Sequence, residues 1–283
     1  MANETTSSSI SELYTEIIQE AIFTFQETSV MRPLVTTYNI TGQGKQVAVP
    51  IFPTVSASAV AEGSDLANSE VNPTETTITA SEVGVMTTLT DLARESSSRP
   101  IAQDIGRVFG EAIAKKVDTD LVGLFPSFAT ANDLGSAGTE LTADLLLKAE
   151  STLRALNVPR PYHAVFHPKA VFNLKKTLTQ AGYSGTATAL SSVGENVYGS
   201  GFVGNIFGID VYENANISID SAGDCVGGVF HPISLGLAMK MDFKLETQRD
   251  ASLRATEIVG TMTYGQGVVK DNYGCQVTVD ASL

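Results

Sequence analysis

Residues 46–93 decide the fold, and they read QVAVPIFPTVSASAVAEGSDLANSEVNPTETTITASEVGVMTTLTDLA. The stretch has no Lys or Arg, whereas its acidic residues are Glu62, Asp65, Glu70, Glu75, Glu82 and Asp91. Residues 46–50 and 83–90 are rich in β-forming residues, and the polar middle has little apolar surface to bury. We therefore predict a long two-stranded arm that leaves the body, with 46–50 as its outgoing strand and 83–90 as its returning strand.

An arm of this kind needs a surface to lie on. An isolated two-stranded hairpin is marginally stable in water, because two strands bury too little apolar surface. The surface that the sequence itself supplies is another copy of the same chain. The stretch therefore predicts self-assembly rather than catalysis.

The composition is that of a folded protein. The chain has 283 residues, of which 43% are hydrophobic and 17% are charged, and it can form one large domain or two smaller ones. Its formal net charge is −13, which argues against tight sequence-independent binding to nucleic acid, since that binding needs Lys and Arg to neutralise phosphates.

Cysteine use and hydropathy indicate a protein made in a cytoplasm. Cys225 and Cys275 are far apart in the sequence, which suggests buried thiols in a reducing compartment, with a disulfide as the alternative. No apolar run reaches the ~20 residues that a membrane-spanning helix needs. Residues 1–9 lack the basic and apolar regions of a signal peptide.

Two helices are predicted around the arm. Apolar residues from Ile10 to Phe25 recur at helical spacing. A second, longer helix begins after the sequence Ser96-Ser-Ser-Arg-Pro100 and continues for about 25 residues, with Val108 among its inward-facing residues. Gly106 and Gly110 lie four residues apart on this helix, so another element can approach it closely there.

Residues 132–235 form a predicted α/β region. Thr142 caps a helix, residues 162–166 form a strand, and His167-Pro168 opens another helix. Residues 183–204 are rich in Gly, Ser, Thr and Ala and are predicted to be a loop, followed by strands at 206–212 and 226–230.

The last part of the chain is predicted to be antiparallel β-structure. Met239, Met241, Phe243 and Leu245 alternate with charged residues, which is typical of a half-buried strand. Residues 254–264 and 267–279 form two more strands, the last broken by a turn at 271–274. These strands have no helix of their own, so we expect the long helix to cover them and the chain to return to the domain that it left.

The order of these parts resembles the major capsid proteins of tailed bacteriophages, which have the Hong Kong 97 type fold. The similarity rests on residues 164–168 before a helix, on 206–211, on 248–250 with 253–255, and on 264–267. The resemblance implies an α+β fold with an N-terminal arm (1–45), an extended β-hairpin loop (46–93), a peripheral domain with a long spine helix and late strands (94–131 and 236–283), and an inserted axial α/β domain (132–235).

The resemblance also implies a function and partners. The chain would be a major capsid protein without catalytic activity, whose hexamers and pentamers form an icosahedral shell. The shell would enclose double-stranded DNA without sequence-specific binding and without a membrane, after assembly in the host cytoplasm. The implied partners are further copies of the chain, a separate scaffolding protein, a portal and, as an option, a decoration protein.

The sequence departs from the family pattern in two ways. Some members cross-link a lysine of the extended loop to a neighbour, but residues 46–93 contain no lysine. Some members carry a large N-terminal scaffolding segment, whereas here the fold is expected to start near Ser9.

Contacts between copies are predicted to join the acidic arm to basic residues elsewhere. The candidates on the arm are Glu62, Asp65, Glu70 and Glu75, and those on the long helix and late strands are Arg99, Arg107, Lys115, Lys116, Lys240, Lys244, Arg249 and Arg254. Exposed ion pairs contribute only about 0–1 kcal/mol each, so these pairs would set register more than strength.

No catalytic, cofactor or metal site is predicted. Residues 199–204 match G-x-G-x-x-G, but a strand rather than a helix is expected after them. His163 and His167 have no evident third metal ligand, and His167 and His231 each precede proline, which suggests capping roles. The alternatives are a phage tail or other virion protein that forms rings or tubes, and an enzyme with a deep polar pocket in the α/β region.

Overall fold

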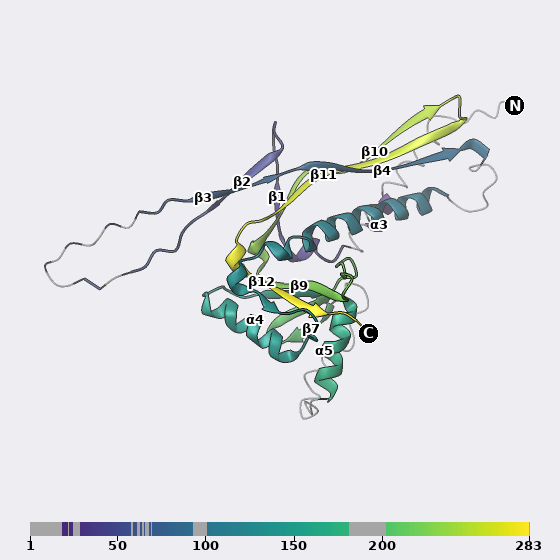
Figure 1. The fold of residues 1–283 in the computed structure, drawn as a ribbon. Helices are drawn as coiled ribbons and strands as arrows, with labels where there is room; N and C mark the ends of the chain where they lie inside the picture. The colour runs from purple at the N-terminus through teal and green to yellow at the C-terminus, as the bar shows by residue number, and fades with distance from the viewer. Residues whose placement is uncertain are drawn as a thin grey trace.

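The computed structural model describes residues 19–21, 23–24, 29–57, 59–60, 63, 65, 68, 70–92, 101–180 and 202–282. Within these ranges the body contains a four-stranded and a six-stranded sheet, and a two-stranded ribbon leaves it (Figure 1). The mixture of helix and sheet that the sequence predicts is therefore present.

The four-stranded sheet has one face covered by a long helix. Its strand order is β1-β10-β11-β4, and all neighbours are antiparallel except β1 and β10. Helix α3 lies along the sheet (Figure 1), and Phe109 of this helix packs with Ile258 and Phe243 of the sheet. The prediction that the long helix covers the late strands is confirmed for β10 and β11. The elements are β1 (Thr36–Asn39), β4 (Ser81–Thr90), β10 (Leu235–Asp250), β11 (Ala255–Val268) and α3 (Ile101–Val122).

The six-stranded sheet carries two helices. Its strand order is β5-β12-β9-β6-β8-β7. The hydroxyl of Thr142 accepts a hydrogen bond from the Leu145 amide at 3.4 Å, so the predicted helix cap is confirmed. The elements are β5 (Leu134–Gly135), β6 (Tyr162–Phe166), β7 (Phe202–Ile206), β8 (Ile209–Glu213), β9 (Asp224–Phe230), β12 (Gly274–Asp280), α4 (Ala143–Ala155) and α5 (Pro168–Gln180).

Short 3₁₀ turns connect these elements. His231 precedes one of them, and its Nδ1 accepts a hydrogen bond from the Ile233 amide at 3.2 Å. Nδ1 of His167 accepts in the same way from the Lys169 amide, so the capping roles of both histidines are confirmed. The turns are η1 (Arg32–Leu34), η2 (Phe125–Ser127), η3 (Thr130–Asn132), η5 (Pro232–Ser234) and η6 (Asp271–Tyr273).

The returning strand of the arm differs from the prediction. The outgoing strand β2 (Gln46–Ile51) pairs with β3 (Thr74–Thr79), whereas β4 pairs with β11 in the body. The apolar face of β4 explains the difference, because Val85 and Leu89 pack against the residues that α3 covers. The predicted pairing of 46–50 with 83–90 was therefore wrong, and the ribbon consists of β2 and β3.

The last strand also has a different partner from the expected one. We expected it to extend the sheet that contains Met239, but β12 lies between β5 and β9 in the six-stranded sheet. Its Cys275, Val277 and Val279 are fully buried in the main core. The η6 turn at Asp271–Tyr273 separates β12 from β11, so the chain crosses from one sheet to the other at the turn that the sequence indicated.

Three local predictions also failed. A shift in register around Met241 breaks the alternation of β10 and leaves this side chain 38% exposed. Val108 was predicted to face inward on α3 but is 59% exposed. The single strand predicted at 206–212 is a hairpin of β7 and β8, with Phe207 and Gly208 both at positive φ in its turn.

The N-terminal part lies on the long helix. Residues 19–21 and 23–24 are helical, and Ala21 and Thr24 are buried. A Cβ atom at Gly110 would lie 2.5 Å from the carbonyl oxygen of Ala21, so this glycine permits the close approach that the sequence predicted. The predicted helix over 10–18, the helix start at 96–100 and most of the predicted loop at 183–204 lie outside the described residues.

Candidate assembly surfaces

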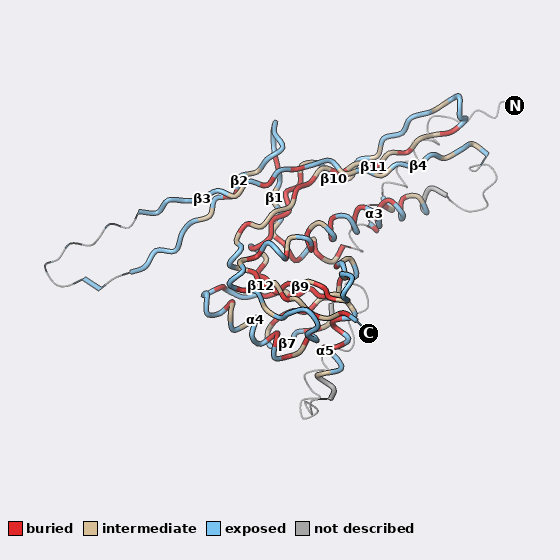
Figure 2. The backbone as a smooth tube through the Cα atoms, in the orientation of Figure 1, coloured by how far each residue is buried: buried red, intermediate tan, exposed pale blue. Residues whose placement is uncertain are grey.

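The ribbon is anchored only at its base. Val49 of β2 and Ile78 of β3 are buried with Ala238 and Val269 of the body in a small apolar cluster. Beyond this cluster the described residues of the arm are almost all exposed, and Figure 2 shows the contrast with the buried strands of the body. The arm therefore has a fixed root and a long part that touches little of its own chain.

The exposed part of the arm combines acidic and apolar side chains. Asp65, Glu70 and Glu75 are exposed and form no ion pair within the described ranges, and Glu62 lies outside them. Phe52 is 64% exposed and Val71 is 47% exposed. A long, base-free surface with exposed apolar side chains is typical of a binding surface rather than of a solvated loop.

Most of the predicted basic partners are already bound within their own chain. The Arg249 guanidinium donates to both carboxylate oxygens of Asp91, at 2.7 and 2.6 Å. These bonds raise the pKa of Arg249, and bonding to Glu246 raises the pKa of Lys244 in the same way. The other pairs are Arg107 with Glu20 at 3.3 Å, Lys116 with Asp120 at 2.6 Å, and Lys240 with the carbonyl of Gly42.

Two of the predicted basic residues remain available. Lys115 on α3 and Arg254 after β10 are both exposed, and neither forms an ion pair within the part of the chain that the structure describes. Arg99 lies outside that part. Of the described basic candidates, the structure thus leaves two without an ion pair, Lys115 on α3 and Arg254 at the turn after β10.

The turn that carries Arg254 is well ordered by its own hydrogen bonds. The Asp250 carboxylate accepts from the amide and hydroxyl of Ser252 and from the amide of Leu253, and these bonds lower the pKa of Asp250. Arg254 has a φ of 50°, and its carbonyl accepts from the Asp91 amide at 3.0 Å. The sequence Asp250-x-Ser252 is a local signal for such a turn.

A buried carboxylate joins three parts of the body. Asp118 of α3 accepts hydrogen bonds from the Ser29 hydroxyl at 2.8 Å, from the amides of Val30 and Met31 at 3.0 and 3.2 Å, and from the Asn214 side chain at 3.1 Å. Burial raises the pKa of Asp118, although these four donors oppose the shift. The sequence analysis missed this residue, because nothing in the helical pattern distinguishes it from a solvated aspartate.

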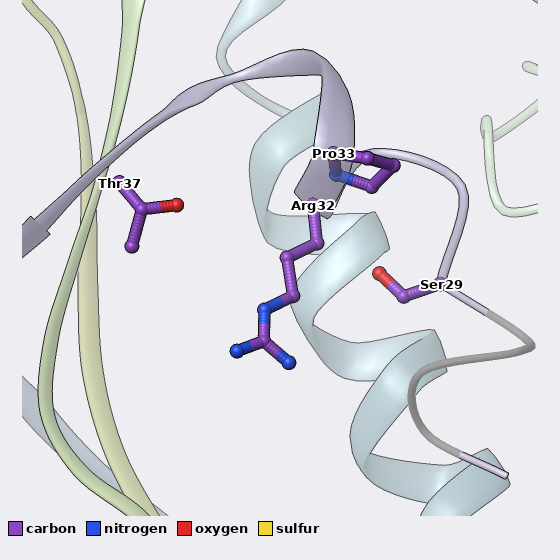
Figure 3. Close-up of a pocket in the computed structure, with 4 residues that line it drawn as sticks. All are labelled: Ser29, Arg32, Pro33 and Thr37. Carbon is purple, nitrogen blue, oxygen red and sulfur yellow. The ribbon is translucent and has the colours of Figure 1, made fainter. Parts of the chain in front are cut away.

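The described surface offers little for catalysis. A shallow hollow of about 390 Å³ is lined by Ser29, Arg32, Pro33 and Thr37, and Figure 3 shows the Arg32 side chain extending between the helix and Thr37. Its lining has no carboxylate, histidine or thiol and offers only two hydroxyls and one guanidinium as polar side-chain groups. The hollow does not support the alternative of an enzyme.

The cysteines are core residues, and His163 is half-buried beside the core. Cys225 and Cys275 are free and buried, as predicted, and burial raises their pKa to about 11 and about 12. His163 lies 3.7 Å from the carboxylate of Asp210, and burial lowers the pKa of its imidazole.

Over the described ranges no three His, Cys, Asp or Glu residues are grouped to hold a metal ion. No described helix is long and apolar enough to cross a membrane.

A family comparison identifies the kind of protein that this chain resembles. The sequence model of the phage capsid protein family matches residues 73–277, which is more than half of the chain. The match begins just before β3 and ends within β12, so it covers most of both sheets but not β1. No protein of curated function matches the sequence.

Solved structures show the same fold. The capsid of Ralstonia phage GP4 matches with a TM-score of 0.72 at 11% identity, covering 91% of this chain and 88% of that one. The capsid of cyanophage P-SCSP1u matches with a TM-score of 0.67 at 17% identity, covering 88% and 87%. The SrpI encapsulin of Synechococcus elongatus PCC 7942 also matches, with a TM-score of 0.63 at 13% identity over 89% and 87%. Because the fold includes an encapsulin, the sequence match is what distinguishes the family.

Proposed function

Because this chain belongs to the phage capsid protein family and is a major capsid protein that forms the shell, we propose that its β2–β3 arm joins one copy to the next. The observation that carries this proposal is the arm itself, which has a buried root, exposed acidic and apolar side chains, and few contacts with its own body. A neighbouring copy supplies the surface that the arm lacks.

The strength of such a shell comes from many modest contacts. A closed shell requires contacts between different surfaces of successive copies, with rotations that close into rings. Each arm contact adds to the contacts between bodies, and linked contacts raise one another's effective concentration. The exposed Phe52 and Val71 contribute apolar burial, while the carboxylates fix the register.

The remaining parts of the shell protein are assigned as follows. The sheet of β1, β4, β10 and β11 with the spine helix α3 forms the peripheral domain. Residues 132–235 together with β12 form the axial domain around the centres of hexamers and pentamers. The icosahedral shell assembles in the host cytoplasm with a scaffolding protein and a portal, encloses DNA without reading its sequence, and leaves a decoration protein as an optional partner.

The family and the fold are those of structural capsid proteins rather than enzymes. The family match also favours a capsid protein over the tail protein considered from the sequence. Without a lysine between Lys45 and Arg94, the arm has no side-chain amine with which to form a covalent cross-link to a neighbour by that route.

A shortened arm tests the proposed function. The last β2–β3 pair is Ile51 opposite Thr74, so residues 52–73 are replaced by Asn-Gly, which closes a two-residue hairpin at that pair. The shortened chain is expected to keep its circular dichroism spectrum and unfolding temperature but to form no shells in electron micrographs. Normal shells from this variant would refute the role of the arm.

A further inference from the structure

The two ends of the molecule have complementary surfaces. Figure 1 shows the arm at one end and the turn between β10 and β11 at the other, so the arm cannot reach this turn within one copy. The arm carries carboxylates and no base, whereas the turn carries Arg254. Both ends also expose large apolar side chains, which are Phe52 and Val71 on the arm and Leu92 and Leu253 at the turn.

The surface at the turn is held in place by its own chain. Arg249 and Asp91 form a two-fold hydrogen-bonded pair across β10 and the end of β4, and Ala255 pairs with Thr90 beside it. This pair engages the carboxylate of Asp91, whose backbone amide donates to the carbonyl of Arg254 at 3.0 Å. The Asp250 Oδ1 in turn accepts hydrogen bonds from the amides of Ser252 and Leu253 in its own turn.

The charged residues that form no ion pair indicate which segment binds at the turn. At the turn, Arg254 is exposed without an ion-pair partner in the described ranges, next to Leu253, which is 60% exposed, and near Leu92, which is 77% exposed. A partner that suits this surface carries carboxylates interspersed with apolar side chains and no competing base. Residues 46–79 of the same sequence, from β2 to β3, have that composition, and Asp65, Glu70 and Glu75 on them form no ion pair within the described ranges.

We propose that the β10–β11 turn, with Arg254 flanked by Leu92 and Leu253, is the surface on which the arm of a second copy docks. This inference rests on the proposed function of the arm and names the surface to which the arm binds, which we call its seat. The contact joins one end of a copy to the opposite end of the next, which is the heterologous arrangement that closed rings require. The leucines supply apolar burial, and Arg254 selects the acidic arm over other segments.

Two charge reversals of equal size test the seat. Arg254→Glu is compared with Lys115→Glu, because Lys115 is the other predicted base that forms no ion pair within the described ranges. Arg254→Glu places like charges opposite each other and is expected to raise the subunit concentration needed for shells by about tenfold or more. Lys115→Glu is expected to assemble like the unchanged chain. Light scattering and electron microscopy of assembling subunits provide the measurement.

A compensating change makes the test specific. Combining Arg254→Glu with Asp65→Lys, Glu70→Lys and Glu75→Lys on the arm is expected to restore assembly, while the arm changes alone impair it. Arg254→Asn removes the charge with a residue that tolerates the φ of 50°, and it is expected to weaken assembly less than the reversal does. Unfolding temperatures of the separate subunits confirm that each variant is folded.

The outcomes separate the two proposals. If Lys115→Glu blocks assembly and Arg254→Glu does not, the seat lies on α3 and this inference is wrong. If neither reversal changes assembly while the shortened arm abolishes it, the arm has another seat, so the inference fails and the proposed function stands. If the shortened arm still forms shells, both fail together.

Discussion

The β6 strand of the body and the β2 strand of the arm show how differently one chain uses the same secondary structure. Ala164, Val165 and Phe166 of β6 are completely buried, whereas the first residues of β2 alternate between exposed and half-buried (Figure 2). The body therefore holds its shape by burying its own side chains. The arm has a defined root, but its stability depends on a surface supplied from outside the chain.

The largest expected effect on the stability of the subunit is that of replacing a buried phenylalanine, compared with an exposed one on the arm. Phe125 is fully buried, with ring centroids 5.7 Å from Phe230 and 6.0 Å from Phe128, whereas Phe52 on the arm is 64% exposed. Phe125→Ala is expected to lower the free energy of unfolding by about 3–5 kcal/mol. Phe52→Ala is expected to leave it unchanged and to reduce shell formation instead.

Urea denaturation of unassembled subunits measures the free energy of unfolding of both variants, and electron microscopy measures their shell formation. Equal losses of unfolding free energy in the two variants would contradict the distinction between body and arm. A Phe52→Ala variant with unchanged assembly would show that this side chain does not contribute to the contact between copies.

A smaller effect is expected from a pair of carboxylates. Asp118→Ala leaves Ser29, Asn214 and two amides without their acceptor in the buried junction, and each buried unsatisfied group costs about 1–3 kcal/mol, partly relieved by local movement. Asp118→Ala is therefore expected to destabilise the subunit clearly. Glu70→Ala on the arm, where the carboxylate is exposed, is expected to be neutral for folding.

Asp118→Asn serves as the control. It keeps one acceptor oxygen but points an amide donor at groups that themselves donate, so its cost should approach that of Asp118→Ala. A neutral result for both variants in chemical denaturation would show that the junction does not depend on this carboxylate.

The sequence predicted those features whose signal lies within one segment. The period of α3 and the alternation near Phe243 report burial against the nearest layer, so the helix and its place on the sheet could be derived. The acidic character of the arm could also be derived, because its charged residues all lie within one segment. Gly110 was also identified, since a small residue on a long helix marks a close approach.

Features that depend on distant segments could not be derived in this way. The β3 strand has only Ile78 as an apolar residue, so the longer apolar run of β4 was mistaken for the partner of β2. Asp118 is buried by Ser29, which lies 89 residues earlier in the chain. Which basic residues stay unpaired depends on contacts such as Arg249 with Asp91, which join strands far apart in sequence.

The smallest expected effect is a pH dependence confined to the body. All three histidines of the chain, His163, His167 and His231, lie there, and burial lowers the pKa of each below its usual value of 6.5. The unfolded chain then binds more protons than the folded chain once the pH falls below that value. The folded body is consequently expected to lose stability as the pH falls, by an amount set by the three shifts together.

His163 is the histidine that tests this most directly. Its Nδ1 is buried without a hydrogen-bond partner in the described ranges, and its ring contacts those of Tyr212 and Phe230. Protonation would place a charge between these rings, with the Asp210 carboxylate as the only acidic group that favours it. His163→Phe is therefore expected to reduce the difference in urea midpoint between about pH 7.5 and about pH 5.5. An unchanged difference would assign the dependence to His167 and His231, and a dependence that vanished with the shortened arm would place it outside the body altogether.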